Sequence, residues 1–426
     1  MRYLFVAAFG IVFFACSGGE GGGVVEIPEQ AAGSSSSSFG ENSGNLSSSS
    51  GGDVCPDTEG SSSSSESDDW KYTGAKEIAA CPIASTVAGP VSFYGRLQAR
   101  GAFIDGVKGT ATVEEVQVRG VSFGWSNTGW ESERFYSANA VERMVKDWKA
   151  EIVRAAYGEH NAANRSRIKT IVDAAIENDI YVIIDFHSHN AHNQVAESNG
   201  FFEEMAKTYG GCNNVIFEIY NEPNCLDGSD VNGCTKTTWT EIKKYAKEVI
   251  PVIRKYSENL VLVGTPSWSR YVQQVVGNAI NDENVGYVLH FYSESHSLSG
   301  NRGNVNRALC AGLPIFVTEY GTTNADGGQC KPSIDNCTGS NSTYGSHSAV
   351  KSDEWHAYMD SKKISSVAWN INDKKEGSAF FGVTQKGFGE AVQAVEANWR
   401  DTEKMTASGK YIFEKLNDYY LSKRWD

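Results

Sequence analysis

The chain has 426 residues, of which 40% are hydrophobic and 11% aromatic, so it is long enough for one large domain with additional segments. Its formal net charge is −14, from 38 Lys and Arg against 52 Asp and Glu. This acidity argues against nucleic acid as a partner.

The amino terminus, residues 1–16, has the pattern of an export signal. Arg2 precedes an apolar run, Tyr3 to Ala15, which is too short to span a bilayer comfortably but is typical of a secretory signal. Ala15-Cys16-Ser17 resembles a bacterial lipoprotein cleavage site with Cys16 as the acylated residue, although Phe13 stands where Leu is usual. An ordinary signal peptide is the alternative. Both predict an exported protein, and membrane contact is expected only through a lipid anchor.

Residues 17–69 have the composition of a flexible tether. They hold ten acidic residues, no Lys or Arg, and the Ser runs 34–38, 47–50 and 61–65. Such a segment cannot bury a core. We therefore expect an anchor or signal at 1–16, an acidic Ser/Gly-rich linker at 17–69 and a catalytic domain at 70–426.

From Trp70 onward, eight short apolar runs alternate with amphipathic, helical patterns. The helical patterns include residues 140–150, 167–180 and 238–256. Near-continuous apolar strands are typical of parallel pairing with both faces buried, and eight strand-then-helix units favour a (β/α)8 TIM barrel. A doubly wound open sheet is the alternative, but it usually has fewer strands, and no Gly-rich phosphate fingerprint follows the first strand. The expected strands are 116–124, 151–158, 181–187, 215–223, 260–266, 286–293, 314–321 and 365–373.

Polar or aromatic residues stand near the carboxyl ends of seven of these strands. In a TIM barrel those ends converge on one face, where active sites lie. Each residue alone has an ordinary structural explanation, but their recurrence from strand to strand favours a functional site. They are Arg154, His187, Asn221, Glu222, Trp268, His290, Tyr292, Glu319 and Trp369.

Glu222 and Glu319 suit glycoside hydrolysis, in which one carboxylic acid protonates the leaving oxygen while the other carboxylate attacks the anomeric carbon or activates water. Arg154, if close, would keep Glu319 ionised, and Tyr292 could donate a hydrogen bond to it. Partial desolvation between Tyr220 and Pro223 would favour the protonated form of Glu222. Aromatic side chains would supply flat faces on which sugar rings stack.

Residues 87–423 resemble glycoside hydrolase family 5, and within it the bacterial endo-β-1,4-glucanases. The matching segments agree in order and spacing along the domain, and the amino terminus looks like those of secreted Fibrobacter-type fibre degraders. The segments are VQVRGVS, EIVRAAYG, YVIIDFHSH, IYNEPN, VGTPSWS, LHFYS, PIFVTEYGTT, AWNINDKKE and ASGKYIF.

The resemblance implies that Glu222 is the acid/base and Glu319 the nucleophile, with retention of configuration. It implies supporting roles for Arg154, His187, Asn221, His290, Tyr292 and Trp369. It also places Trp268, Lys374 and Glu376 along the sugar subsites.

The chain departs from the family pattern in its first two loops. VSFGWSNTGW lacks the His that many relatives have after the first strand, so Trp125 or Trp130 is expected to serve the nonreducing subsites. RAAYGEHN replaces the usual RAAMY, which displaces Tyr157 by one position. Both departures concern substrate binding and leave the preferred glycan open.

The nine cysteines become eight if Cys16 is acylated, and an even number in an exported chain favours disulfides. Cys225 and Cys234 flank one loop, Cys330 and Cys337 flank another, and we expect each pair to bond locally. Elimination then leaves Cys55 with Cys81, and Cys212 with Cys310. The spacings do not fit a zinc site, residues 324–328 offer too few ordered ligands for calcium, and no cofactor is expected.

The leading function is therefore endo-β-1,4-glucanase, acting as a monomer on cellulose or soluble β-glucan. Mannanase, xyloglucanase or licheninase activity on the same scaffold is the alternative enzyme. A non-catalytic carbohydrate-binding surface protein is the alternative class. The presence of both carboxylates with their supporting residues favours an enzyme.

Overall fold

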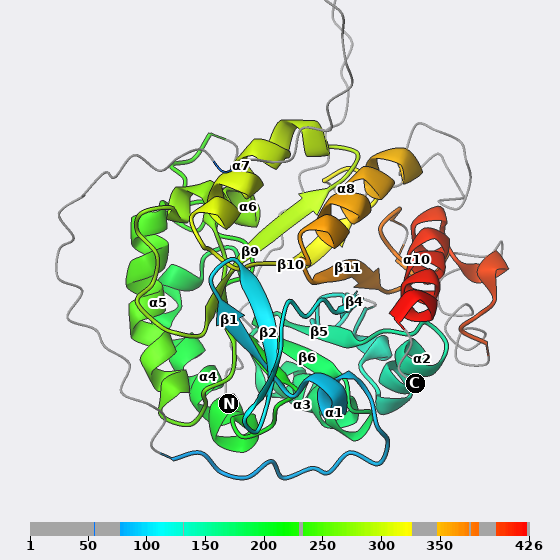
Figure 1. Ribbon diagram of the computed structural model, residues 1–426, viewed down its shortest axis with the longest axis horizontal. Helices are drawn as coiled ribbons and strands as arrows, with labels where there is room; N and C mark the ends of the chain where they lie inside the picture. Colours follow the sequence, from blue (N-terminus) through cyan, green and yellow to red (C-terminus); the bar gives the residue numbers. More distant parts are fainter. Residues whose placement is uncertain are drawn as a thin grey trace, which may run out of the picture. The chain divides into compact units, whose positions relative to one another are not determined.

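The computed structural model describes residue 55 and residues 77–130, 132–229, 233–325, 347–374, 376–382 and 398–423. Eight parallel strands close into a barrel in the order β10-β11-β4-β5-β6-β7-β8-β9 (Figure 1). The last strand in the chain pairs with the first, which gives the predicted (β/α)8 barrel. The strands are β4 (Arg119–Phe123), β5 (Ile152–Tyr157), β6 (Tyr181–Phe186), β7 (Val215–Glu218), β8 (Val261–Val263), β9 (Val285–Tyr292), β10 (Ile315–Gly321) and β11 (Ser366–Ile371).

All eight predicted strands are present, and every residue within them is buried. Burial on both faces explains why the sequence shows continuous apolar runs instead of alternation. Two strands end three or more residues earlier than predicted, β7 at Glu218 and β8 at Val263. Asn221 and Glu222 therefore lie on the loop that follows β7, where side chains can turn into the barrel mouth.

Helices surround the strands, and the residues between the two layers form the main hydrophobic core. The three amphipathic stretches predicted from the sequence correspond to α2, α3 and α5. A capping box, formed by Thr238 and Glu241, fixes the start of α5. The longer helices are α2 (Ala138–Lys146), α3 (Ala162–Glu177), α4 (Val195–Tyr209), α5 (Trp239–Arg254), α7 (Leu298–Cys310), α8 (Ala349–Ser361) and α10 (Ala407–Lys423).

A small antiparallel sheet, not predicted from the sequence, covers the amino end of the barrel. It consists of β1 (Arg96–Arg100), β2 (Phe103–Lys108) and β3 (Ala111–Val113), drawn across the front of the barrel in Figure 1. Leu97 and Ile104 of this sheet join one apolar cluster with barrel residues. The amino end is thereby filled with packed side chains, which leaves the carboxyl end as the open mouth.

The disulfides agree only in part with the sequence predictions. Cys225 and Cys234 are bonded, as predicted. The pairs assigned by elimination are wrong, because Cys81 bonds Cys212 and Cys55 bonds Cys310. These pairs had been assigned only because the other four cysteines were already paired, and this reasoning does not show which cysteines lie close together in the fold. In the structure, Ala79 packs against the backbone at Gly211, which brings Cys81 beside Cys212. The predicted Cys330–Cys337 pair lies outside the described residues.

The bond between Cys55 and Cys310 attaches residue 55 to the end of α7. The chain is therefore linked to the barrel by a disulfide at residue 55, which precedes Trp70, the residue at which the composition becomes globular. Apart from Cys55, the proposed signal and linker lie outside the described residues. Within the described ranges, no helix combines the length and apolar character needed to cross a bilayer.

Removal of the Cys81–Cys212 bond should destabilise the protein more than removal of Cys225–Cys234. The two bonds span 131 and 9 residues, and the chain-entropy model assigns roughly 5 and 2–3 kcal/mol to loops of these lengths. Urea unfolding followed by tryptophan fluorescence measures both effects in paired Cys→Ser variants. An equal or larger loss from the short loop would contradict this expectation.

Candidate active site

The carboxyl ends of β9 and β10 and the loops after β6, β7 and β8 bring their side chains to one cavity. Its volume is about 470 Å³, and it lies at the open mouth of the barrel. It contains both predicted carboxylates and is walled by aromatic and imidazole rings. Its lining residues are His189, Glu222, Trp268, Arg270, His290, Tyr292, His296, Glu319 and Ala325.

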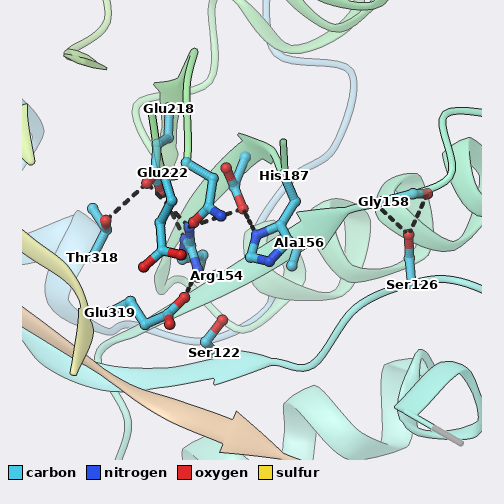
Figure 2. A network of polar contacts seen from close by, with 12 residues as sticks. Ser122, Ser126, Arg154, Ala156, Gly158, His187, Glu218, Glu222, Thr318 and Glu319 are labelled. Atoms are coloured by element: carbon cyan, nitrogen blue, oxygen red, sulfur yellow. Dashed lines mark hydrogen bonds and ion pairs between the residues drawn. The ribbon is translucent and has the colours of Figure 1, made fainter. Parts of the chain in front are cut away.

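Arg154 on β5 joins the acidic side chains beneath this cavity (Figure 2). Its Nε and Nη2 donate to the two oxygens of Glu218, at 2.7 and 3.1 Å. Nη1 donates to Glu319 Oε2 at 3.0 Å, and Nη2 donates to Asn221 Oδ1 at 2.7 Å. Nη2 also lies 2.9 Å from Asp185 Oδ2. One fully buried guanidinium thus fixes side chains from three strands and one loop.

The charges around Arg154 shift the pKa of each partner differently. Burial acts to lower the pKa of Arg154, but Asp185, Glu218 and Glu319 together raise it above its ordinary value. Burial raises the pKa of Asp185 well above normal despite Arg154. Burial acts in the same sense on Glu218, but its two bonds to Arg154 and the nearby His290 lower its pKa overall. Glu218 is therefore the carboxylate that most fully neutralises Arg154.

Glu319 on β10 is held at both oxygens. Tyr292 Oη donates to Oε1 at 2.8 Å, and Arg154 Nη1 donates to Oε2, which are the two contacts expected from the sequence. The pKa of Glu319 is nevertheless raised, because burial and the Glu222 carboxylate outweigh His290 and Arg154. Arg154 and Tyr292 do act to lower this pKa, as expected, but burial and Glu222 outweigh them. The contact with Arg154 therefore orients the carboxylate and offsets part of the cost of burying it.

Glu222 is bonded to His290, and the rest of the hydrogen-bond chain fixes which ring nitrogen carries a proton. Thr318 Oγ1 donates to Glu218 Oε1 at 2.8 Å, so it can only accept from His290 Nε2, which lies 2.9 Å away. His290 Nδ1 lies 2.9 Å from Glu222 Oε1. His290 therefore carries one proton on Nε2. The proton between Nδ1 and Glu222 belongs either to His290, as an imidazolium, or to Glu222, as a carboxylic acid.

In the arrangement that the structure shows, this shared proton lies on the histidine. Burial acts to lower the pKa of His290, but the neighbouring Glu218 and Glu222 carboxylates raise it to about 9. Burial acts to raise the pKa of Glu222, but its interactions with His189 and His290 lower it to about 2. The expectation that desolvation alone keeps Glu222 protonated is wrong, because the sequence did not reveal that two histidines contact it.

The two carboxylates lie close together. An oxygen of Glu222, an oxygen of Glu319 and a nitrogen of His290 all lie within 4.8 Å of one another. Three such ligands could hold a metal ion, but a cation there would have to displace the bond between His290 and Glu222. The expectation that no metal is required stays a prediction.

His187, Trp369, Trp125 and Trp130 gather on the β4 and β11 side of the mouth. The rings of His187 and Trp369 are parallel, with centroids 5.4 Å apart, and Trp125 meets His187 edge-on at 4.2 Å. Trp125 and Trp130 lie 5.3 Å apart. Lys374 Nζ lies 5.0 Å from the ring centroid of Trp130. These residues form one aromatic group, and Trp130 is 42% exposed at its outer edge.

Glu376 lies in the turn after β11 and accepts hydrogen bonds from Asn370, Asn372 and Ser378 at 3.2–3.3 Å. Its contacts among the described residues therefore brace that turn.

Trp268 lies apart from this group, in α6 (Pro266–Ser269) after β8. Ser267, Trp268 and Ser269 all have left-handed backbones, with φ of 59°, 58° and 55°. Such a conformation costs roughly 1–2 kcal/mol for each non-glycine residue. Ser269 Oγ donates to Asn221 O at 2.6 Å, and Trp268 N–H donates to Pro223 O at 2.9 Å. Strained backbone at such a wall is typical of functional sites.

Sequence reasoning missed six polar residues that the structure places in or beside the site, which are Asp185, His189, Glu218, Arg270, His296 and Thr318. Asp185 bonds His187 at 2.6 Å, and His189 lies 3.4 Å from Glu222. The available signal was a charged residue inside each of two buried strands, since Asp185 and Glu218 interrupt apolar runs on β6 and β7.

A larger hollow, of about 600 Å³, is lined by residues outside the barrel strands, mainly within 87–93, 145–151 and 178–180. Apolar residues and lysines line most of it, and its one acid, Glu151, forms an ion pair with Lys423. It holds no pair of carboxylates among its lining residues, so hydrolytic chemistry is assigned to the barrel mouth.

A (β/α)8 barrel with two neighbouring carboxylates at its carboxyl end has the arrangement of a glycoside hydrolase. The sequence pattern of the family described as "Cellulase (glycosyl hydrolase family 5)" matches residues 109–375. The chain belongs to this family.

Relatives and solved structures agree with this assignment. Endoglucanase Z of Dickeya dadantii (strain 3937) is 39% identical over 293 residues, covering 66% of this chain and 62% of that protein. Endoglucanase A of Butyrivibrio fibrisolvens is 32% identical, covering 68% of this chain and 63% of its own length. A variant of the Thermobifida fusca endoglucanase Cel5A catalytic domain, solved with cellotetraose, is 27% identical with a TM-score of 0.63. That match covers 78% of this chain and all of the other. The chain thus spans less than two thirds of the two curated relatives.

Replacing Arg154 with Gln should destabilise the fold strongly, because three buried carboxylates would lose their shared cation. Breaking a buried ion pair on one side costs about 3–5 kcal/mol. Arg165 offers a matched control, because its ion pair with Glu204 is about one-third exposed. Arg165→Gln should cost under about 1 kcal/mol. Urea unfolding of both variants gives the comparison, and equal losses would contradict the central role of Arg154.

Proposed function

We propose that the protein is a retaining endo-β-1,4-glucanase that hydrolyses internal bonds of cellulose or soluble β-glucan by double displacement. The observation that carries this proposal is the closeness of Glu222 and Glu319. One carboxylate oxygen of Glu222 lies within 4.8 Å of one carboxylate oxygen of Glu319. Retaining glycosidases place their carboxyl groups about 5–5.5 Å apart, whereas inverting enzymes leave about 6.5–9.5 Å for a water molecule.

The choice of glucan as substrate is supported by the walls of the mouth and by the relatives. Indole and phenol rings offer flat apolar faces to uncharged sugar rings, and they stand on both sides of the carboxylate pair. The two curated relatives are named endoglucanases, and a related catalytic domain was solved with cellotetraose. Their lengths differ from this chain, so the polymer preferred here is part of the proposal.

In the first step, Glu319 attacks the anomeric carbon while Glu222 protonates the departing glycosidic oxygen. The bond from the anomeric carbon to that oxygen breaks, and a covalent glycosyl ester forms on Glu319. Tyr292 and Arg154 hold both oxygens of Glu319, so one lone pair stays aimed at the sugar. Asn221 Oδ1 accepts a hydrogen bond from Arg154. This contact fixes the orientation of the side-chain amide, whose NH2 group can then donate to the 2-hydroxyl of the sugar.

The proton for the leaving group comes from the bond that joins Glu222 to His290. Before a sugar binds, this proton lies on the imidazole of His290. A bound sugar excludes water from the site. Without water, the ion pair of the Glu222 carboxylate and the His290 imidazolium is less stable than the neutral pair of carboxylic acid and imidazole. The proton then moves to Glu222, where it can reach the glycosidic oxygen. His290 keeps its other proton on Nε2, bonded to Thr318.

In the second step, Glu222 acts as a base. It removes a proton from water, which attacks the anomeric carbon and releases Glu319 as a carboxylate. The proton returns to the pair formed by Glu222 and His290, so the site is restored without a cofactor. Two successive inversions give net retention.

Export and anchoring complete the proposal. Three disulfides in the described ranges are typical of a protein that folds in an oxidising compartment. Residues 1–16 would direct export, with Cys16 as the lipid attachment site, and residues 17–69 would tether the monomeric catalytic domain. A tether gives reach, which suits a polymer that is too large to diffuse to the enzyme.

Substrate preference is tested with a panel of carboxymethylcellulose, lichenan, glucomannan, xylan and xyloglucan. We expect the fastest release of reducing ends from β-1,4-glucan, with a rapid fall in viscosity because the cuts are internal. Much faster cleavage of mannan or xylan would favour the alternative β-glycanase activities. Binding without cleavage of any polymer would favour the non-catalytic alternative.

The pH dependence of kcat/KM should be bell-shaped, with an alkaline limb near pH 9. Activity requires Glu319 to be ionised, and its raised pKa sets the acid limb above the ordinary carboxyl range. Activity also requires one proton on the Glu222–His290 pair, which is lost as the pH rises through the His290 pKa of about 9.

His290→Gln should move that limb at least one pH unit lower, because Glu222 alone must then retain the proton. The acid limb, which depends on Glu319, should move much less. An alkaline limb that stays near pH 9 in the variant would contradict the shared proton.

A further inference from the structure

A short antiparallel pairing, or hairpin, begins at Cys225, three residues after Glu222. Cys225 and Lys236 form an antiparallel bridge, and Leu226 N–H donates to Thr235 O at 2.9 Å. The disulfide between Cys225 and Cys234 closes the same hairpin. The position of Lys236 is therefore fixed by a covalent bond and by backbone pairing, both adjacent to Glu222.

The side chain of Lys236 reaches back toward the cavity and makes two polar contacts there. Its Nζ donates to Asn224 Oδ1 at 2.6 Å. The same nitrogen lies 4.1 Å from the ring centroid of Trp268, close enough for a cation–π interaction. Lys236 and Trp268 are both half-buried, and Asn224 is fully buried. The contact thus joins the hairpin to the wall of the cavity.

The backbone of Trp268 and of both its neighbours is left-handed, and contacts from outside this segment add to those that hold it. The Trp268 N–H bonds the carbonyl of Pro223, the residue next to Glu222. Lys236 then fixes the indole ring from the other end. The proposed acid and the Trp268 ring consequently share one support, made of residues 221–225 and the hairpin.

The order of strands around the barrel separates the two aromatic groups. Trp268 follows β8, whereas Trp125 follows β4, four strands away on the opposite side of the mouth. Glu222 lies on the loop after β7, beside β8. The acid delivers its proton to the leaving oxygen, so the leaving sugar belongs on the β8 side, against Trp268.

We propose that Lys236 is a positioning residue that holds the Trp268 ring as a platform for the sugar on the leaving-group side of the cut. This inference rests on the proposed glucanase mechanism for the identity of the sugar. The Cys225–Cys234 hairpin presents the lysine, and the cation–π contact fixes the ring. Lys236 itself takes no part in bond breaking.

The kinetic test compares two substrates that share the same donor sugars. Cellopentaose places sugars on the leaving-group side, whereas 2,4-dinitrophenyl β-cellobioside has a small leaving group that needs no platform. In Lys236→Met, kcat/KM for cellopentaose should fall about 5- to 20-fold, mainly through KM, while the aryl substrate changes less than 2-fold. Lys236→Arg should restore most of the loss, since a guanidinium also stacks on indole.

A double variant tells whether the lysine acts through the ring. Trp268→Ala should reproduce the selective loss, and adding Lys236→Met to it should cause little further change. Lys243→Met is the matched control, because Lys243 likewise donates to an asparagine, Asn278, at 2.8 Å but lies on α5 away from the cavity. Equal losses on both substrates in Lys236→Met, or additive losses in the double variant, would overturn the proposal.

A second readout does not depend on the substrate. The protein is labelled with 5-fluorotryptophan, and the Trp268 signal is assigned by its loss in Trp268→Phe. In ¹⁹F NMR, Lys236→Met should shift or broaden that signal, while Lys236→Arg and Lys243→Met should leave it near its original position. An unchanged signal in Lys236→Met would overturn the positioning role. If the wild type cleaves no glucan, the proposed function fails, but this measurement still decides the role of Lys236.

Discussion

The buried guanidinium of Arg154 is the interaction on which the arrangement of the site depends. It contacts Asp185, Glu218, Glu319 and Asn221, which come from three strands and the loop after β7. Three carboxylates in a buried space repel one another, and each would take up a proton if no cation were present. With Arg154 in place they keep fixed orientations. Glu319, the proposed nucleophile, would therefore be aimed before substrate arrives, which would remove reorganisation from the proposed reaction.

The two acids differ because their partners differ. Glu319 receives fixed donors at both oxygens, which suits attack by a carboxylate. Glu222 faces two histidines and exchanges a proton with one of them, which suits an acid that later acts as a base. His290 connects the two sides, because its Nε2 leads through Thr318 to Glu218 and so back to Arg154. A change at any member is expected to alter the protonation of the others.

The sequence predicted the barrel because strands buried on both faces produce apolar runs that local reading detects. It missed β1–β3, which are short, partly exposed and separated by glycine-containing turns. Both carboxylates were found because they stand near the carboxyl ends of predicted strands, whereas Asp185 and Glu218 were overlooked inside apolar runs. The protonation of Glu222 was mispredicted because His290 is 68 residues distant in sequence. The prediction of the long-range disulfide partners failed for the same reason, because the spacing of cysteines along the sequence does not show which of them meet in the fold.

The central claim is that Glu319 forms the covalent intermediate and Glu222 moves the proton. Azide rescue of two alanine variants tests it most directly. In Glu222→Ala, an aryl cellobioside should still load Glu319, and azide should release the β-glycosyl azide. In Glu319→Ala, azide should attack from the face left empty and give the α-product. The opposite pair of anomers would reverse the roles of the two acids, and α-anomer as the first product of the wild type would exclude retention.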